Sequence, residues 1–235
     1  MFMKILCIFA TTIALHISST SPNTPASNTE KQISTSVIEL ILTCQHVRKA
    51  QKLAYWLVAM AEIVTIVAQH GPAWTYSGTI MNVLSFNVDL NSAAMTHSLA
   101  TGSLLVVIGG ILRLQCYTTL GRHFTFEAVI RRDHQLVKDG PYNYMRHPSY
   151  TGAVLAYIGF MIYYGSSGTW FRECLISGTT VGKILAGSGA IGMSLVIGGL
   201  LFRIPKEDRA LREKFGQEWE AWATEVPYVL IPKIY

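Results

Sequence analysis

Charged and aromatic residues that could bind or position a substrate gather in a block from His134 to Gly152. Asp-Gly-Pro at 139–141 is typical of a turn, and Pro148 can open a helix at its first position. The run Arg-His-Pro-Ser-Tyr at 146–150 is therefore predicted to lie at a helix N-terminus, where the helix dipole favours a carboxylate or a phosphate. The alternative is structural: these Arg and Tyr side chains would only anchor the chain at a membrane interface.

A second block of charges begins at Arg203, directly after an apolar stretch. Pro205 predicts a break or kink, and Gly216 predicts the end of the helix that follows. Arg203 and Glu207 are four residues apart, so a continuous helix would place both on one side. There Arg can grip a carboxylate, and Glu can accept from hydroxyl or amine donors. The alternative is a solvated helix whose Arg203 reaches to lipid headgroups. The aromatic tail over 219–232 is expected to lie on the membrane surface or to cover a site.

Two other patterns are not expected to carry chemistry. The segment Gly187–Gly192 matches the dinucleotide fingerprint G-x-G-x-x-G, but no strand precedes it and it lies within an apolar stretch. We predict that its small residues let a neighbouring helix approach closely. The four cysteines, Cys7, Cys44, Cys116 and Cys174, are far apart and form no C-x-x-C pair, so neither a disulfide framework nor a structural metal site is indicated.

The elements that position these blocks are predicted to be membrane helices. Half of the 235 residues are apolar and 14% are charged, with a mean hydropathy of +0.32, which excludes an ordinary soluble domain. We predict an all-α, multi-pass transmembrane helical bundle of about five spans, with a cytosolic C-terminal catalytic region. The spans are expected over five apolar stretches, which are Phe2–Ile17, Leu53–Gln69, Leu99–Tyr117, Tyr150–Tyr164 and Ile184–Phe202. Glu62 lies inside the second stretch and is either functional or a structural partner.

Lys and Arg residues assign the loops to the two sides of the membrane. The segment 73–97 carries none, whereas 113–146 carries six and 203–214 carries five. The two basic segments are therefore predicted to be cytosolic and the first segment luminal. The net charge of +5 is spread over these loops and is not gathered in one stripe, which argues against nucleic-acid binding.

The N-terminal segment leaves two alternatives open. Residues 1–19, with Lys4 before an apolar run, are similar to a signal peptide, but the basic cluster at 48–52 places the start of the second span in the cytosol. We favour a retained first helix with a luminal N-terminus over cleavage, although Lys4 argues against that orientation. Residues 21–30 are predicted to form a flexible loop, and residues 37–47 are predicted to lie along the membrane interface.

Taken together, the two blocks resemble the isoprenylcysteine carboxyl methyltransferase family. The first matches L-V-x-x-G-x-Y-x-x-x-R-H-P-S-Y-x-G at Leu136–Gly152, and the second matches R-x-x-x-E-x-x-x-L-x-x-x-F-G at Arg203–Gly216. An ending V-x-x-x-x-I-P follows at Val226–Pro232. The N-terminal part of the chain matches only in hydropathy. The resemblance implies a catalytic region over 131–235 that contains the last two spans, and N-terminal spans and loops over 1–130.

The resemblance also implies roles for individual residues. In the family, matching positions contact S-adenosylmethionine, which here points to His134, Gln135, Leu136, Val137, Tyr142, His147, Pro148, Ser149, Tyr150 and Glu207. Arg203 is implied to grip the carboxylate of the substrate, and no metal ion is implied. Family members often carry a further cofactor-binding Gln upstream. The corresponding stretch here, Phe126–Arg132, contains none, which puts that contact in doubt.

The implied reaction is methylation of the C-terminal carboxylate of a prenylated cysteine, with S-adenosylmethionine as methyl donor. Its partners would be protein C-termini carrying farnesyl or geranylgeranyl cysteine and the lipid bilayer, without nucleic acid, at the endoplasmic reticulum membrane with the active site facing the cytosol. Because a carboxylate is ionised at neutral pH, the enzyme mainly has to position two reactants and exclude water. The alternatives are a membrane methyltransferase acting on a phospholipid amine or other small lipid, a lipid double-bond reductase using a nicotinamide cofactor, and a non-catalytic scaffold.

Overall fold

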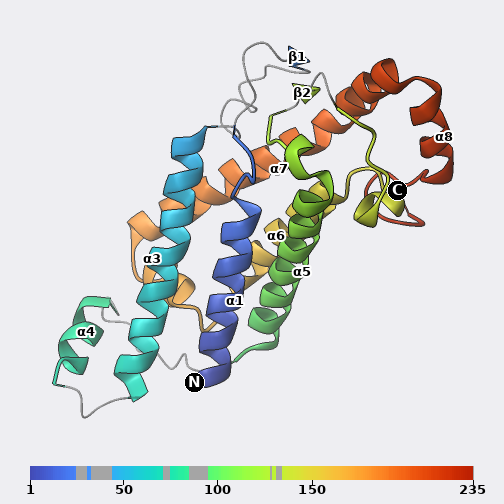
Figure 1. The fold of residues 1–235 in the computed structure, drawn as a ribbon. Helices are drawn as coiled ribbons and strands as arrows, with labels where there is room; N and C mark the ends of the chain where they lie inside the picture. The colour runs from blue at the N-terminus through green and yellow to red at the C-terminus, as the bar shows by residue number, and fades with distance from the viewer. Residues whose placement is uncertain are drawn as a thin grey trace. The chain divides into compact units, whose positions relative to one another are not determined.

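The fold is almost entirely helical, as the sequence predicts (Figure 1). The computed structural model describes residues 1–24, 31–32, 44–70, 75–84, 95–127, 129–130 and 134–234. The α-helices are α1 (Phe2–Ser18), α3 (Gln45–His70), α4 (Ser77–Leu84), α5 (His97–Leu120), α6 (Pro148–Gly165), α7 (Thr180–Phe215) and α8 (Gln217–Glu225). Shorter helical turns cover Gly121–His123, Gly140–Asn143 and Phe171–Ile176. The two-residue strands β1 (Lys31–Gln32) and β2 (Val129–Ile130) pair antiparallel.

All five predicted apolar stretches fall inside helices, because a chain in lipid must satisfy its backbone hydrogen bonds within each segment. Among the described residues, three helices are long and apolar enough to cross a membrane: Gln45–His70, His97–His123 and Thr180–Phe215. The apolar helix Phe2–Ser18 is shorter. This composition fits a multi-pass membrane protein, and the count of five spans stays a prediction.

Helix α7 differs from the expectation in two respects. First, it runs through Pro205 to Phe215, so the predicted break is wrong, whereas the alternative of a kink stays a prediction. One internal proline removes a single backbone donor, which the rest of a 36-residue helix can tolerate. Second, no described atom outside the helix lies within 4 Å of a Cβ placed on Gly187, Gly189 or Gly192. The predicted close approach of a neighbouring helix at these glycines is therefore wrong for the described part of the chain.

Gly216 ends α7 as predicted. Its φ is +53°, in the left-handed region that glycine adopts without strain, and its N–H donates to the carbonyl of Arg212 at 2.9 Å. The chain can therefore turn sharply into α8, whose first residue is Gln217. Because α8 follows directly, the direction of this turn sets the positions of its aromatic side chains, Trp219 and Trp222.

The chain divides into two compact units, each made of segments that are distant in sequence. Unit 1 comprises residues 1–16, 50–107 and 155–193. In this unit α5 and α6 pack backbone to backbone, because a Cβ on Gly102 would lie 2.5 Å from the amide nitrogen of Tyr163. A Cβ on Gly159 would likewise lie 2.6 Å from the amide nitrogen of Val106. Its largest core cluster consists of Ala14, Leu15, Tyr55, Leu99, Val106, Tyr163 and Tyr164.

Glu62 has a structural partner within unit 1. Its carboxylate lies 3.1 Å from Nζ of Lys4, and both side chains are almost fully buried. Nζ of Lys4 also donates to the carbonyl of Gly168 at 2.5 Å. Of the two interpretations that the sequence left open for Glu62, these contacts favour the structural one. The orientation and retention of the first helix stay predictions. The loop predicted at 21–30 and the interfacial segment at 37–47 lie partly outside the described residues.

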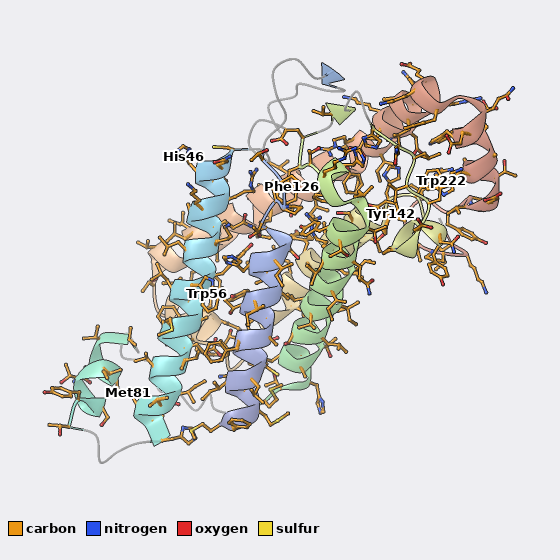
Figure 2. All side chains as sticks on the ribbon, in the orientation of Figure 1. His46, Trp56, Met81, Phe126, Tyr142 and Trp222 are labelled. Carbon is orange, nitrogen blue, oxygen red and sulfur yellow. The ribbon has the colours of Figure 1, made fainter. Side chains whose placement is uncertain are left out.

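Unit 2 comprises residues 17–49, 108–154 and 194–235, and it holds both sequence blocks and the aromatic tail. Its core cluster consists of Cys116, Tyr117, Phe124, Tyr142, Trp222 and Val226. Side chains packed against this core include Leu136, Val137 and Trp219. Phe126, Tyr142 and Trp222 are labelled in Figure 2. The functional division at residue 130 stays a prediction.

Candidate active site

Arg203 and Glu207 form a buried ion pair one turn apart on α7. Nε of Arg203 donates to Oε1 of Glu207 at 2.7 Å, and the two side chains are only 7% and 17% exposed. Nη1 of Arg203 donates to the carbonyl of Phe126 at 2.8 Å. The helix is continuous here, so the predicted placement of both residues on one side is confirmed. The guanidinium is therefore held in a fixed orientation.

Glu207 also connects the two sequence blocks. The hydroxyl of Tyr150 donates to its Oε1 at 2.7 Å, and Nδ1 of His147 lies 3.6 Å from its Oε2. The imidazole of His147 stacks on the ring of Tyr150, with centroids 5.5 Å apart and planes within 9°. The guanidinium of Arg203 lies 5.7 Å from the centroid of that tyrosine ring. The structure thus brings together four of the predicted site residues: Arg203, Glu207, His147 and Tyr150.

Asp208 joins this network, and the sequence analysis missed it. Its Oδ1 lies 2.9 Å from Nε2 of His147, and its Oδ2 lies 3.4 Å from Nη2 of Arg146. Adjacent helix positions point in different directions, so Asp208 engages His147 from another side than Glu207 does. An acidic residue beside Glu207 was the only signal that the sequence offered.

Arg113 of α5 holds the start of α6, and this role was also missed. Its Nη1 donates to the carbonyl of Ser149 at 3.0 Å and lies 3.3 Å from the Ser149 hydroxyl, while its Nε donates to the hydroxyl of Tyr117 at 3.0 Å. A Cβ on Gly152 would lie 2.8 Å from Cγ of Arg113, so the close approach requires glycine there. The sequence analysis used Arg113 only as one of the six basic residues that assign the segment 113–146 to the cytosol.

The segment from His134 to Tyr142 contributes apolar contacts through three of its side chains, and its Lys138 pairs with Glu218 at 3.1 Å. Leu136 and Val137 pack against the core of unit 2, and Tyr142 belongs to that core. Burial raises the pKa of Tyr142 well above its usual value, so its phenol is neutral. The ring centroid of His134 lies 6.0 Å from that of Phe215 on α7.

The predicted turn at 139–141 is confirmed. A short helical turn begins at Gly140, which has a φ of +58°. The predicted helix start at Pro148 is confirmed as well, and Pro148 is buried. Gln135 is exposed. Its predicted role stays a prediction.

The C-terminal tail, residues 226–234, lies against the first block. The backbone N–H groups of Arg146 and His147 donate to the carbonyls of Tyr228 and Val229, both at 2.9 Å. The hydroxyl of Thr151 donates to the carbonyl of Leu230 at 2.7 Å. Of the two placements expected for the aromatic tail, these bonds support the one that covers a site.

The arrangement offers fixed charges and hydrogen-bonding groups at the end of membrane helices. A buried guanidinium beside an ionised carboxylate can bind a ligand that carries both a negative and a positive group. Among the described residues, no group of three His, Cys, Asp or Glu side chains is placed to hold a metal ion.

Comparison with known proteins finds similarity to methyltransferases over part of this chain. The model of the Phospholipid methyltransferase family matches residues 97–185, which include the first block and end before Arg203. The chain is 34% identical over 129 residues to "Protein-S-isoprenylcysteine O-methyltransferase B" of Arabidopsis thaliana, covering 54% of this chain and 55% of that protein. It is 32% identical over 128 residues to "Probable protein-S-isoprenylcysteine O-methyltransferase" of Oryza sativa subsp. indica, covering 53% of this chain and 56% of that protein.

A fission-yeast relative extends the alignment. "Protein-S-isoprenylcysteine O-methyltransferase" of Schizosaccharomyces pombe is 25% identical over 177 residues, covering 74% of this chain and 65% of that protein. The chain thus spans between 55% and 65% of the length of these relatives. The resemblance predicted from the two blocks is confirmed: over more than half of its length, this chain is similar to the isoprenylcysteine carboxyl methyltransferases.

Proposed function

We propose that this protein methylates the C-terminal carboxylate of a prenylated cysteine, with S-adenosylmethionine as methyl donor, and so forms a methyl ester. The observation that carries the proposal is the buried Arg203–Glu207 pair, which Tyr150 and His147 connect to the first block. A fixed, buried guanidinium suits recognition of a carboxylate better than a flexible surface one does. The names of the similar proteins from Arabidopsis thaliana and Schizosaccharomyces pombe support the same chemistry.

The residues present fit an adenosyl cofactor. Such a cofactor carries a flat aromatic base, an ammonium group and a carboxylate. Leu136, Val137 and Tyr142 offer an apolar and aromatic surface for the base. Glu207 offers an anionic acceptor for the ammonium group, next to the guanidinium of Arg203. When bound, S-adenosylmethionine supplies a methyl group activated on a sulfonium centre.

The side chains of this protein then have a positioning task. Arg203 would hold the substrate carboxylate, and Glu207 keeps the guanidinium oriented through the 2.7 Å hydrogen bond to Nε. Because the carboxylate is already ionised at neutral pH, no side chain has to remove a proton from it. Holding two reactants in line can supply several kcal/mol of the barrier reduction, on the order of 7–11 at best.

The surroundings of the site suggest how the two reactants arrive. In this proposal the prenyl chain would enter from the bilayer, between helices that are long and apolar enough to cross a membrane. Basic residues at 203–214 favour a cytosolic site, which a water-soluble cofactor can reach. We place the protein at the endoplasmic reticulum membrane, with prenylated protein C-termini as its partners.

A second candidate is methyl transfer to a phospholipid amine or another small lipid. The description of the matching family model, Phospholipid methyltransferase, favours it. Under this alternative Glu207 would face an amine, and Arg203 would face a lipid phosphate.

A methyl-transfer assay separates the two candidates. Membranes containing the protein are incubated with radiolabelled S-adenosylmethionine and N-acetyl-S-farnesylcysteine. A base-labile methyl ester supports the proposal, whereas label in the lipid extract supports the phospholipid alternative. In the Arg203→Met variant ester formation should be lost, and in Arg212→Met it should persist, because Arg212 is 62% exposed and pairs with the exposed Glu220. Full ester formation by Arg203→Met would overturn the role assigned to Arg203.

A further inference from the structure

Three buried N–H donors in unit 2 have no hydrogen-bond partner among the described residues. They are Nε of Arg146, Nε1 of Trp219 and Nε1 of Trp222. Buried donors are paired in the great majority of cases in native proteins, and an unpaired one costs about 1–3 kcal/mol. All three groups can only donate. A ligand that satisfied them would therefore have to bring acceptor atoms.

The donors belong to one cluster. Trp219 and Trp222 are three positions apart on α8 and so share a helix face. The guanidinium of Arg146 lies 5.6 Å from the centroid of the Trp219 ring. Trp222 belongs to the core cluster that contains Tyr142, and Trp219 and Leu136 pack against that cluster. Tyr142 and Leu136 are two of the residues predicted to contact the cofactor.

Two other tryptophans of the described chain show that unpaired indoles are not a general property of the fold. Nε1 of Trp170 donates to the carbonyl of Leu84 at 2.9 Å, and Nε1 of Trp56 donates to Nδ1 of His16 at 3.2 Å. Trp170 is 9% exposed and Trp222 is 3% exposed, so the two are buried to a similar degree. What distinguishes Trp222 is that its Nε1 has no hydrogen-bond partner within the described part of the chain.

We propose that the indole N–H groups of Trp219 and Trp222, together with Nε of Arg146, donate hydrogen bonds to the methyl-donor cofactor, so that α8 forms one wall of the cofactor site. The inference rests on the proposed function and extends the site to a helix that neither sequence block includes. The cofactor fits better than the substrate does. A prenylcysteine offers chiefly one carboxylate, assigned to Arg203, and an apolar chain. An adenosyl cofactor carries ring nitrogens, ribose oxygens and a carboxylate as acceptors.

The test measures binding of S-adenosylhomocysteine to the purified full-length protein in detergent by titration calorimetry. Replacing Trp222 by Phe keeps an aromatic ring in the core and removes the N–H. Loss of one neutral hydrogen bond should raise the dissociation constant by about 2- to 12-fold. Trp170→Phe is the matched control. It also loses a buried indole and is destabilised, but its N–H is satisfied within the protein, so the dissociation constant should stay at the wild-type value.

Two further variants keep the test decisive if Trp222→Phe fails to fold. Trp219→Phe changes a less buried indole, and Arg146→Lys keeps the charge while removing Nε. Each should weaken binding while the protein still unfolds cooperatively on heating. Wild-type affinity in the folded tryptophan variants would overturn this inference and leave the proposed function standing. No binding of S-adenosylhomocysteine by the wild-type protein would instead refute the proposed cofactor, and this inference with it.

Discussion

Replacing Arg203 by Met should destabilise the protein as well as stop ester formation. The substitution keeps an apolar stem and removes the charge that faces Glu207 at 2.7 Å. Breaking a buried ion pair by removing one partner costs about 3–5 kcal/mol. For a chain of 235 residues, each kcal/mol lowers the unfolding temperature by about 2–4 °C, so a fall of about 6–20 °C is expected.

A double-mutant cycle isolates the contribution of the pair. Glu207→Gln alone removes the carboxylate that faces the guanidinium of Arg203 and keeps its hydrogen bond to the carbonyl of Phe126, so this variant should be destabilised as well. The double variant Arg203→Met with Glu207→Gln carries neither charge. Its loss of stability should fall short of the sum of the two single losses by at least about 1 kcal/mol. The exposed pair of Arg212 gives the scale for a surface contact, about 0–1 kcal/mol.

Thermal unfolding in detergent, followed by fluorescence, measures these differences, and ester formation is assayed below the unfolding temperature of every variant. If Arg203→Met unfolded at the wild-type temperature, the pair would not be a buried ion pair in the folded protein. Losses that simply added in the double variant would likewise refute the coupling between the two charges. Either result would remove the argument that Glu207 orients the guanidinium of Arg203, to which we assign the substrate carboxylate.

Three further perturbations follow from contacts of single residues. Tyr150→Phe removes a hydroxyl that donates to the Glu207 carboxylate and should cost about 1.5–3 kcal/mol in thermal unfolding, with a folded and helical product by circular dichroism. Gly140→Ala forces a side chain into the left-handed region at φ +58° and should cost about 1–2 kcal/mol; an unchanged unfolding temperature would contradict that backbone conformation. Lys4→Met leaves Glu62 buried without its cation and should cost about 3–5 kcal/mol, most of which the additional change Glu62→Gln should restore.

The helices over the five apolar stretches could be predicted from the sequence, because a long apolar stretch can be recognised without knowing the rest of the fold. All five stretches are helical, and the end of α7 before Gly216 was expected, but the continuity of α7 through Pro205 was not. A charged extension after the span was expected to begin with a break or kink at Pro205. The observed helix instead continues to Phe215, since the residues after the proline favour helix strongly enough to offset one missing donor.

The site was predictable where its geometry is local. Arg203 and Glu207 meet because a helix places positions i and i+4 together, whatever the rest of the fold does. The contacts made by Asp208 and Arg113 join residues 61 and 36 positions apart. Such pairs depend on how the elements of unit 2 pack, and no spacing rule in a single sequence contains that information.

The bonds between the tail and the first block set an order of events during synthesis. The hydroxyl of Thr151 bonds to a carbonyl 79 residues further along the chain, and the neighbouring backbone bonds reach equally far. At about 5–20 residues per second, the ribosome needs roughly 4–16 s to add that length. Until then the segment at 146–151 lacks the carbonyls that its N–H and hydroxyl groups bind in the finished protein. A nascent chain arrested before residue 228 would therefore contain all the apolar helices that the structure describes and yet hold an incomplete site.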